Sequence, residues 1–288
     1  MKKVVKFGGS SLANAEQFQK VGDIIRSDES RRYVVPSAPG KRFDEDIKVT
    51  DMLYGCYDVA SKGEDFSDKL KAIKERYYEI IKGLGLTLSL EDEFKKIEED
   101  FRAQAGIQYA ASRGEFLNGK IMAAYLGYDF VDAASVIRFD KNGNLEAEET
   151  NKLLSKKLSK CQSAVIPGFY GACADGTVKT FSRGGSDVTG SLVAKAIHAD
   201  IYENWTDVSG FLVTDPRIVH NPEPIEAITY RELRELSYMG ATVLHEDAIF
   251  PVRKEGIPIN IRNTNSPEDK GTLIVESTCK KPKFTITG

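Results

Sequence analysis

Short apolar runs alternate with helical patterns along this sequence, and that order limits the folds open to it. The apolar runs are rich in valine and isoleucine and are closed by glycine, proline or serine, as strands are. Between them, apolar residues recur at the spacing of amphipathic helices. This pattern is typical of an α/β fold with a mostly parallel sheet. We expect strands at residues 4–7, 33–35, 163–166, 200–205, 257–261 and 272–275.

The helical patterns include one long block, from about residue 51 to 105, which we expect to be a helical insertion. Apolar stripes run along this block, and its charged opposite faces are typical of solvated surfaces. Gly83-Leu84-Gly85 divides it into separate helices. Other helices are expected to begin at Asn14, where Gln17 completes a capping box, near Arg113, and at the Thr229-x-x-Glu232 capping box.

Two glycine turns, far apart in the sequence, each carry charged residues at a junction between a strand and a helix. Lys6 precedes Gly8-Gly9-Ser10-Ser11, and Arg183-Gly184-Gly185-Ser186-Asp187 opens a helix. Backbone N–H groups at such turns attract phosphate and carboxylate oxygens, and a lysine there can neutralise a transferring phosphoryl group. The pair suggests phosphoryl transfer to a small anionic acceptor.

Either glycine turn alone is more often a simple tight turn, and a lone lysine before glycines is more often a surface charge. The pair supports the inference because α/β proteins bind ligands at such junctions. Neither turn matches G-x-x-x-x-G-K-[ST], and the sequence contains no G-x-G-x-x-G. A kinase with these turns would not be a P-loop kinase.

The composition argues against several classes of protein. The 288 residues carry a formal net charge of −3, without the basic excess typical of nucleic-acid binders. The four cysteines form no C-x-x-C pair and the three histidines are dispersed, so we expect reduced thiols and no metal site. Neither a secretory signal nor an apolar stretch of about 20 residues is apparent. We expect a cytoplasmic protein that binds neither nucleic acid nor membrane.

An ordered set of motifs spans nearly the whole sequence and resembles the aspartokinases, within the wider amino-acid kinase family. Each motif alone is weak, but together they occur in the order found in that family. They are Lys6-Phe7-Gly8-Gly9-Ser10-Ser11, Gly114-Glu115, Gly168-Phe169, Arg183-Gly184-Gly185-Ser186-Asp187, Trp205-Thr206-Asp207-Val208, Thr214-Asp215-Pro216-Arg217 and Gly240-Ala241-x-Val243-Leu244-His245.

The resemblance implies ATP-dependent phosphorylation of the side-chain carboxylate of L-aspartate to 4-phospho-L-aspartate, the first step toward lysine, threonine and methionine. It also implies a three-layer α/β/α sandwich with a mainly parallel central sheet. Residues 1–197, with the helical insertion, would form the aspartate-binding lobe, and residues 198–288 the ATP-binding lobe. ATP and Mg²⁺ would be required, and a homodimer is a possible assembly.

The chemistry of aspartate agrees with the residues that the resemblance assigns to its site. Arg183 can hold the α-carboxylate with two parallel hydrogen bonds, which a lysine could not do as well. Glu115 can pair with the ammonium group. On the residues alone, Glu115 could instead be a first-turn glutamate that favours the helix dipole. The other residues that correspond to substrate-binding positions of the family are Ser37, Thr50, Phe169 and Ser186.

Catalysis would need no general base, because the attacking carboxylate is already ionised at neutral pH. Positioning and charge neutralisation would then dominate. We expect Lys6 to stabilise the transferring phosphoryl group and Asp187 to orient Lys6 or a metal-bound water. The alternative for Asp187 is a helix-terminal residue that favours the dipole. Mg²⁺ keeps waters and phosphate ligands, so no cage of protein carboxylates is expected.

The nucleotide side shows two departures from the family pattern. Leu212 stands where the family often has tyrosine, and Thr242 stands where it usually has lysine. These changes put nucleotide affinity in question, and Arg253 or Lys254 could compensate for the lost charge. The residues that the resemblance assigns to ATP are Lys6, Gly8, Gly9, Ser10, Thr206, Asp207, Leu212, Arg217 and Thr242.

Family members usually continue after the strand at 271–275 into ACT-type regulatory domains, and here residues 276–288 follow. We therefore expect a kinase domain without them. Two other functions stay open. One is a carboxylate or phosphate kinase of the same fold that acts on another substrate. The other is a non-catalytic ligand-binding or regulatory subunit, which the departures at Leu212 and Thr242 motivate.

Overall fold

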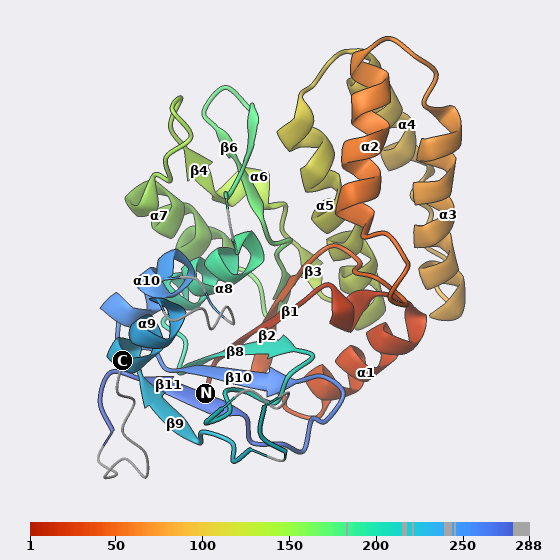
Figure 1. Cartoon of the computed structure of the whole chain (residues 1–288). Coiled ribbons are helices and arrows are strands. Elements are labelled where there is room, and N and C mark those ends of the chain that lie inside the picture. Colours follow the sequence, from red (N-terminus) through yellow and green to blue (C-terminus); the bar gives the residue numbers. More distant parts are fainter. Residues whose placement is uncertain (183, 215–217, 221, 239–243, 245, 279–288) are drawn as a thin grey trace.

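The central element of the protein is a twisted, mainly parallel sheet (Figure 1). The computed structural model describes residues 1–278 apart from 183, 215–217, 221, 239–243 and 245. Within these residues the sheet has eight strands in the order β3-β5-β2-β1-β8-β10-β11-β9. They are β1 (Lys3–Phe7), β2 (Arg31–Pro36), β3 (Asp129–Phe130), β5 (Ala164–Val165), β8 (Ile201–Thr206), β9 (Ala227–Thr229), β10 (Ile259–Asn263) and β11 (Thr272–Val275).

Neighbouring strands of this sheet are parallel, except for the antiparallel pair β10 and β11. Helices cover both of its faces. The expected α/β sandwich with a mainly parallel sheet is therefore confirmed. The helical elements are η1 (Ser10–Leu12), α1 (Ala15–Arg26), α2 (Val49–Ser61), α3 (Ser67–Gly83), α4 (Glu91–Arg102), α5 (Ile107–Leu126), α6 (Ala133–Val136), α7 (Ala147–Leu158), α8 (Gly185–Ala196), α9 (Tyr230–Tyr238) and α10 (Glu246–Lys254).

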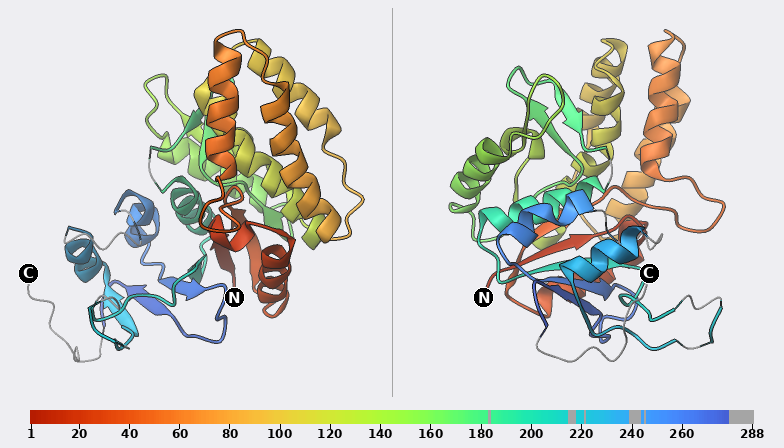
Figure 2. Two further views of the ribbon diagram at one scale, coloured as in Figure 1. Left: turned by 45° about the vertical axis from the view of Figure 1, so that its right-hand side comes forward. Right: turned by 60° about the vertical axis from the view of Figure 1, so that its left-hand side comes forward.

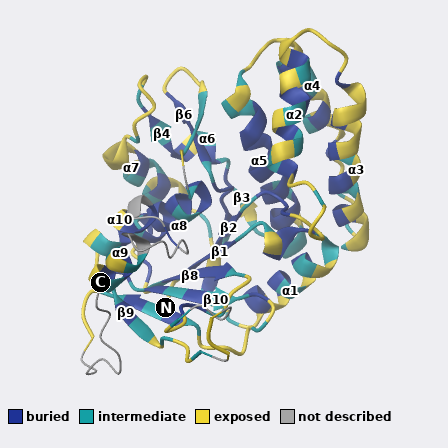
Figure 3. Cartoon of the chain, viewed as in Figure 1, coloured by how far each residue is buried: buried dark blue, intermediate teal, exposed yellow. Residues whose placement is uncertain are grey.

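Strand alternation divides the apolar side chains between two cores. Val4 of β1 belongs to the core under α6 to α10, whereas Val5 and Phe7 belong to the core under α1 to α5. Successive strand residues point to opposite faces of a sheet, so one short strand supplies both cores. Figure 3 shows the buried inner sides of these helices and their exposed outer sides.

The expected helical insertion corresponds to α2, α3 and α4, which pack with α5 into one group that projects from the sheet (Figure 2). α3 ends at Gly83, as the Gly83-Leu84-Gly85 interruption predicted. A small second sheet, whose strand β7 contacts α5, was not expected from the sequence. It consists of β4 (Arg138–Phe139), β6 (Tyr170–Cys173) and β7 (Val178–Thr180). None of the helices in the described ranges has the length and hydropathy to cross a membrane.

The expected helix starts are partly confirmed. The side chain of Asn14 accepts a hydrogen bond from the amide of Gln17 at 2.9 Å. The Gln17 side chain does not complete the box but donates to Asn265 at 3.3 Å. The Thr229-x-x-Glu232 box is complete, since the Thr229 amide donates to the Glu232 carboxylate at 2.7 Å and the Glu232 amide to the Thr229 hydroxyl at 3.2 Å.

The expected start of a helix near Arg113 is wrong. α5 begins at Ile107, directly after Gly106, whose φ of 99° is favourable only for glycine. Arg113 and Glu115 therefore lie inside the helix and not in its first turn. The alternative interpretation of Glu115, as a first-turn residue that favours the helix dipole, is therefore wrong. The division into lobes at 197/198 stays a prediction, and both parts contribute strands to the same sheet.

A buried group of charges fixes the centre of the sheet. The Glu203 side chain on β8 is 1% exposed and accepts hydrogen bonds from Arg31 at 2.8 Å, Lys3 at 3.0 Å and the Trp205 indole at 2.9 Å. Burial alone would raise the pKa of Glu203, but Arg31 and Lys3 hold it below its usual range. The charge of Glu203 is therefore compensated by cations from β1 and β2.

Replacing Glu203 by alanine should destabilise the fold strongly, because it leaves the buried Arg31 guanidinium group and the Trp205 indole N–H without their carboxylate acceptor, whereas Lys3 keeps Asp28. Breaking a buried pair in this way typically costs about 3–5 kcal/mol. Urea unfolding followed by circular dichroism would measure the change. Asp58→Ala, which removes an exposed partner of Lys62 on α2, is the control and should leave the stability almost unchanged. A loss for Glu203→Ala as small as that of the control would contradict this account.

Candidate active site

The two adjacent strands β1 and β8 end side by side, and their ends carry the first glycine turn and the Trp-Thr-Asp turn. Phe7 lies opposite Trp205 in the parallel register, and the Gly8 amide donates to the Trp205 carbonyl at 3.0 Å. Ligands of α/β proteins bind beyond the carboxyl ends of such strands. Thr206 ends β8, and its hydroxyl donates to the Asp207 carboxylate at 3.1 Å. Gly8, Thr206 and Asp207 are therefore brought to the same edge.

The first glycine turn presents free backbone donors. The amides of Ser11 and Leu12 donate back to Gly8 and Gly9 at 3.1 and 3.0 Å, which forms the single turn η1. Among the described residues, no acceptor is recorded for the amides of Gly9 and Ser10. Two such N–H groups beside a lysine can hold an anion.

Glycine is needed at the second position of this turn because another part of the backbone lies against it. A β-carbon on Gly9 would be 2.9 Å from the carbonyl oxygen of Ala38. The amide of Gly40 donates to the Gly9 carbonyl at 2.8 Å. The segment after β2 thus supports the turn from behind and leaves its amides accessible.

Lys6 and Asp187, which are predicted to be catalytic, form a close ion pair. Lys6 Nζ lies 2.7 Å from Asp187 Oδ1, and their side chains are 11% and 17% exposed. Asn204 of β8 completes a triangle, since its side chain accepts from Lys6 at 3.3 Å and donates to Asp187 at 2.9 Å. Asp187 lies in the first turn of α8. Two segments far apart in the sequence therefore meet on one face of the sheet.

Sequence reasoning missed Asn204. It lies opposite Lys6 in the register of β1 with β8, and only this pairing shows that the two side chains share a face. The available signal was a polar residue inside an otherwise buried strand, where Asn204 is 4% exposed. A buried amide of this kind is expected to have hydrogen-bond partners.

Glu115 supplies a buried carboxyl group that forms no ion pair within the described part of the chain. Its side chain points from the middle of α5, and the residue is 5% exposed. The Ala38 amide donates to this carboxyl group, but within the described chain Oε2 has no hydrogen-bond partner. Burial raises the pKa of Glu115 to about 8, and the Ala38 amide and Arg113 offset this only in part. An ammonium group bound here would satisfy the free oxygen.

Ser37 and Thr50 lie on the same side of the molecule as Glu115. The Ser37 amide donates to the Phe7 carbonyl at 3.1 Å, and the Ser37 carbonyl accepts from the Asn118 side chain at 2.6 Å. Thr50 lies in the first turn of α2, and its hydroxyl would be 3.8 Å from a β-carbon on Gly114. These two residues therefore flank the segment of α5 that carries Glu115.

Phe169 and Ser186 join the second glycine turn to the end of β2. The Gly168 amide donates to the Pro36 carbonyl at 3.1 Å, and a β-carbon on Gly168 would collide with Ser186. Phe169 has a φ of 80°, a conformation that non-glycine residues rarely adopt and that costs about 1–3 kcal/mol. Its amide donates to the Thr189 hydroxyl of α8 at 3.2 Å. Backbone strain of this kind is concentrated at functional sites.

Three predicted site residues lie outside the described residues, so the structure does not test their placement: Arg183, Arg217 and Thr242. Leu212 is 38% exposed and forms an isolated antiparallel bridge with Pro224. In the described ranges, no three His, Cys, Asp or Glu side chains cluster in a way that could hold a metal ion.

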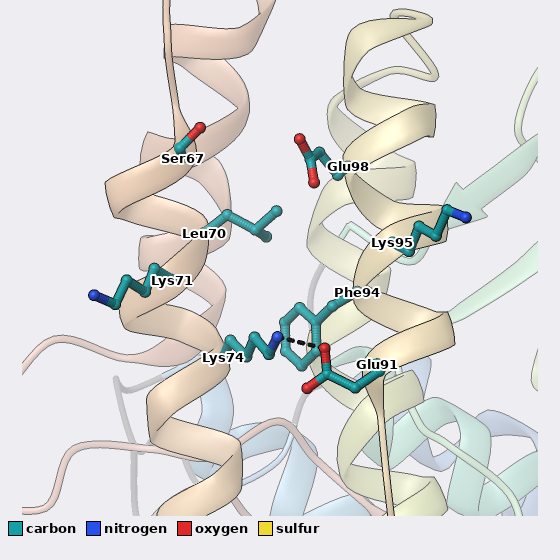
Figure 4. A pocket seen from close by; sticks show the side chains of 8 residues that line it. All are labelled: Ser67, Leu70, Lys71, Lys74, Glu91, Phe94, Lys95 and Glu98. Carbon is teal, nitrogen blue, oxygen red and sulfur yellow. Dashed lines mark hydrogen bonds and ion pairs between the residues drawn. The ribbon is translucent and has the colours of Figure 1, made fainter.

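A hollow of about 260 Å³ lies elsewhere, between α3 and α4 (Figure 4). An ion pair of 2.6 Å between Lys74 and Glu91 crosses it, and Leu70 and Phe94 form part of its wall. None of the predicted site residues belongs to its lining. It is a groove of the helical insertion, separate from the glycine turns.

The raised pKa of Glu115 predicts how stability depends on pH. Between the ordinary pKa of 4.5 and the folded value of about 8, folded Glu115 keeps a proton that the unfolded chain has lost. The free energy of unfolding should therefore fall as the pH rises through this interval. Glu115→Gln should remove this pH-dependent loss of stability. At about pH 8, the free energy of unfolding of the variant should exceed that of the wild type by a few kcal/mol.

Urea unfolding at several pH values would measure this effect. Glu99→Gln, at an exposed position of α4, is the control and should follow the wild-type profile. Parallel pH profiles for Glu115→Gln and the wild type would show that burial does not perturb Glu115.

Comparisons with known proteins agree with this geometry. Residues 1–263 match the amino acid kinase family. Aspartokinase 3 of Bacillus subtilis is 40% identical over 95% of this chain and 63% of its own length. The crystal structure of Clostridium acetobutylicum aspartate kinase superposes with a TM-score of 0.93 at 55% identity, over 97% of this chain and 64% of that one. Escherichia coli aspartokinase III, solved with aspartate and ADP, gives a TM-score of 0.83 at 28% identity, over 96% and 65% of the two chains.

The chain thus spans a little under two thirds of the length of these relatives. The family model covers most of its length, including both strands that carry the Lys6 and Asn204 side chains. The chain belongs to the amino acid kinase family.

Proposed function

We propose that the protein transfers the terminal phosphoryl group of ATP to the side-chain carboxylate of L-aspartate and forms 4-phospho-L-aspartate. The observation that carries the proposal is the largely buried ion pair of Lys6 and Asp187 beside the amides of Gly9 and Ser10, which have no acceptor among the residues that the structure describes. The similarity to aspartokinases of three bacteria supports aspartate as the acceptor. The reaction would be the first step toward lysine, threonine and methionine, in the cytoplasm.

The donor side works through charge neutralisation. The amides of Gly9 and Ser10 and the ammonium group of Lys6 supply fixed positive charge where the transferring phosphoryl group becomes more negative. Asp187 and Asn204 hold the ammonium group in place, so little reorganisation is needed during the reaction. The acceptor carboxylate is ionised at neutral pH, and no side chain has to remove a proton.

The acceptor side works through positioning. We propose that Glu115 binds the ammonium group of aspartate, because its free carboxylate oxygen is buried and unpaired among the described residues. Arg183 would hold the α-carboxylate with two hydrogen bonds. Together they would fix the direction of the side chain toward the phosphoryl group. Ser37, Thr50, Phe169 and Ser186 would line the rest of the acceptor site.

The nucleotide would lie along the end of β8. Thr206, Asp207, Leu212, Arg217 and Thr242 would contact it, with residues 198–288 as the ATP-binding lobe. Mg²⁺ fits the donor set here, since one carboxylate, Asp187, lies beside the first glycine turn (Gly8–Ser10), called the phosphate turn below. Mg²⁺ usually combines one or two carboxylates with phosphates and waters. When bound, it supplies positive charge to the phosphates.

An acyl-phosphate assay tests the proposed reaction. The purified chain, ATP, Mg²⁺ and aspartate should give a product that hydroxylamine traps as a hydroxamate. N-acetylglutamate, glutamate and UMP serve as competing acceptors, with ADP release as the common readout. Turnover with one of these acceptors and none with aspartate would assign the chain to another reaction of the family. Binding of aspartate without any turnover would indicate a regulatory subunit.

Lys6→Ala should lower turnover by about 10²–10³-fold, because one preorganised charge is lost from the reacting centre. Circular dichroism would show whether the fold is retained. Lys20→Ala, on the outer side of α1 with an exposed side chain, is the matched control and should keep wild-type turnover. If Lys6→Ala also keeps it, Lys6 has no part in the chemistry.

A further inference from the structure

One arginine of the helical insertion is buried in the apolar face of its helix. Arg76 of α3 is 4% exposed and lies on the same side as Ile73, Tyr77 and Ile80, all of them buried. The expected solvated surfaces are the charged faces opposite the apolar stripes, and Arg76 is a charged residue on the apolar side that the sequence analysis did not single out. A buried guanidinium group needs hydrogen-bond partners to offset its lost hydration.

The partners of Arg76 are three backbone carbonyl groups and one carboxylate, from two segments of the chain. Nη2 donates to the Gly40 carbonyl at 2.7 Å and to the Ala13 carbonyl at 3.5 Å. Nη1 donates to the Ile47 carbonyl at 3.5 Å and lies 2.9 Å from the Asp46 carboxylate. Ala13 directly follows η1, the single turn that starts at Ser10, and the other three residues belong to the loop between β2 and α2.

That loop is closed around the guanidinium group. The amide and side chain of Arg42 both donate to Asp46 at 2.9 Å, and the Val49 amide donates to the Pro39 carbonyl at 3.2 Å. The loop therefore has a fixed base and an internal ion pair. It begins beside the Gly8–Ser10 turn and ends at Lys48, two residues before Thr50 of the proposed acceptor site.

Gly40 is the residue through which this loop contacts the Gly8–Ser10 phosphate turn. Its amide donates to the Gly9 carbonyl at 2.8 Å. A β-carbon on Gly40 would lie only 2.6 Å from the carbonyl carbon of Gly9 and 2.8 Å from the amide nitrogen of Ser10. A displacement of Gly40 must therefore move the two residues whose amides face the proposed phosphate.

We propose that Arg76 is a positioning residue, which holds the Gly8–Ser10 phosphate turn and the 40–48 loop in one fixed arrangement through Gly40 and Asp46. This inference rests on the function proposed above. Through Arg76, the helical insertion would help to fix the distance between the phosphoryl donor and the acceptor. The planar fork of arginine suits this task, since it can bind several oxygens at once, whereas lysine acts as a point charge.

A purely structural role for Arg76 makes a different prediction. It would lower the stability of the fold but leave the chemistry of the folded fraction unchanged. A positioning role lowers kcat and weakens nucleotide binding in protein that remains folded. The two roles can therefore be separated by measurements well below the unfolding midpoint.

The single tryptophan offers a direct signal from the turn. Trp205 is 1% exposed and stacks on Phe7 with ring centroids 5.9 Å apart. Its carbonyl accepts the amide of Gly8 at 3.0 Å. Trp205 fluorescence should therefore change when MgATP binds at the turn, independently of any turnover.

The experiment compares Arg76→Met, Arg76→Lys and Gly40→Ala in the full chain. Arg76→Met should lower kcat by about 10–100-fold, the size of effect that a small misplacement of reacting groups produces. It should also weaken MgATP binding in the fluorescence titration. Arg76→Lys should lower kcat and MgATP affinity by smaller amounts, because lysine keeps the charge opposite Asp46 but lacks the planar guanidinium group that binds several oxygens. Gly40→Ala, which displaces the same turn without removing the Arg76 side chain, should reproduce the kinetic change.

Lys71→Met, at a position of α3 whose side chain is 72% exposed, is the control and should match the wild type. Wild-type kcat and MgATP affinity in folded Arg76→Met would overturn the proposal. If Arg76→Met does not fold, Gly40→Ala decides, and an unchanged kcat and MgATP affinity for that variant would likewise overturn it. A wild-type chain that binds MgATP but makes no acyl phosphate would refute the proposed reaction alone, since the titration still tests Arg76.

Discussion

The parallel pairing of β1 with β8 is the interaction on which the site depends. It places Lys6 opposite Asn204 and Phe7 opposite Trp205, although 198 residues separate the members of each pair. The buried carboxylate of Glu203 compensates Arg31 and Lys3 in the same region and so stabilises this register. A slip of one residue would turn Lys6 to the other face of the sheet. The ion pair with Asp187 could not then form.

The two sides of the site differ in how their charges are compensated before any ligand binds. Lys6 already has Asp187 and Asn204, so its ammonium group is held in place. Within the described residues, Oε2 of Glu115 has no hydrogen-bond partner, and burial raises the pKa of Glu115 to about 8 although backbone amides donate to its carboxyl group. A protein-held cation suits a group that must stabilise negative charge during the reaction. An uncompensated carboxyl group suits the binding of an ammonium ion, which would ionise it.

Local features of the fold could be predicted from the sequence, because their causes lie within a few residues. Asn14 and Thr229 cap their helices as expected, and the main strands lie close to the apolar runs. The sequence prediction puts the start of α5 near Arg113, whereas the break in the backbone is at Gly106, directly before Ile107. The second sheet was missed because its strands are only two to four residues long.

The parts of the site that could not be predicted depend on contacts across the fold. Asn204 is placed by the register of β1 with β8, two strands that are far apart in the sequence. Arg76 contacts three backbone carbonyls, which leave no pattern in the side chains, and the carboxylate of Asp46 in a separate loop. The motifs located Lys6, Asp187 and Glu115, but they did not show which of these charges is paired. That distinction comes from burial and geometry alone.

A crystal structure of the chain with aspartate, Mg²⁺ and a non-hydrolysable ATP analogue would test the central claim most directly. The account predicts the terminal phosphate within hydrogen-bond distance of the Gly9 and Ser10 amides and the Lys6 ammonium group, with the ammonium group of aspartate on Glu115. A terminal phosphate bound away from the Gly8–Ser10 turn, with Lys6 still paired only to Asp187 and Asn204, would contradict it.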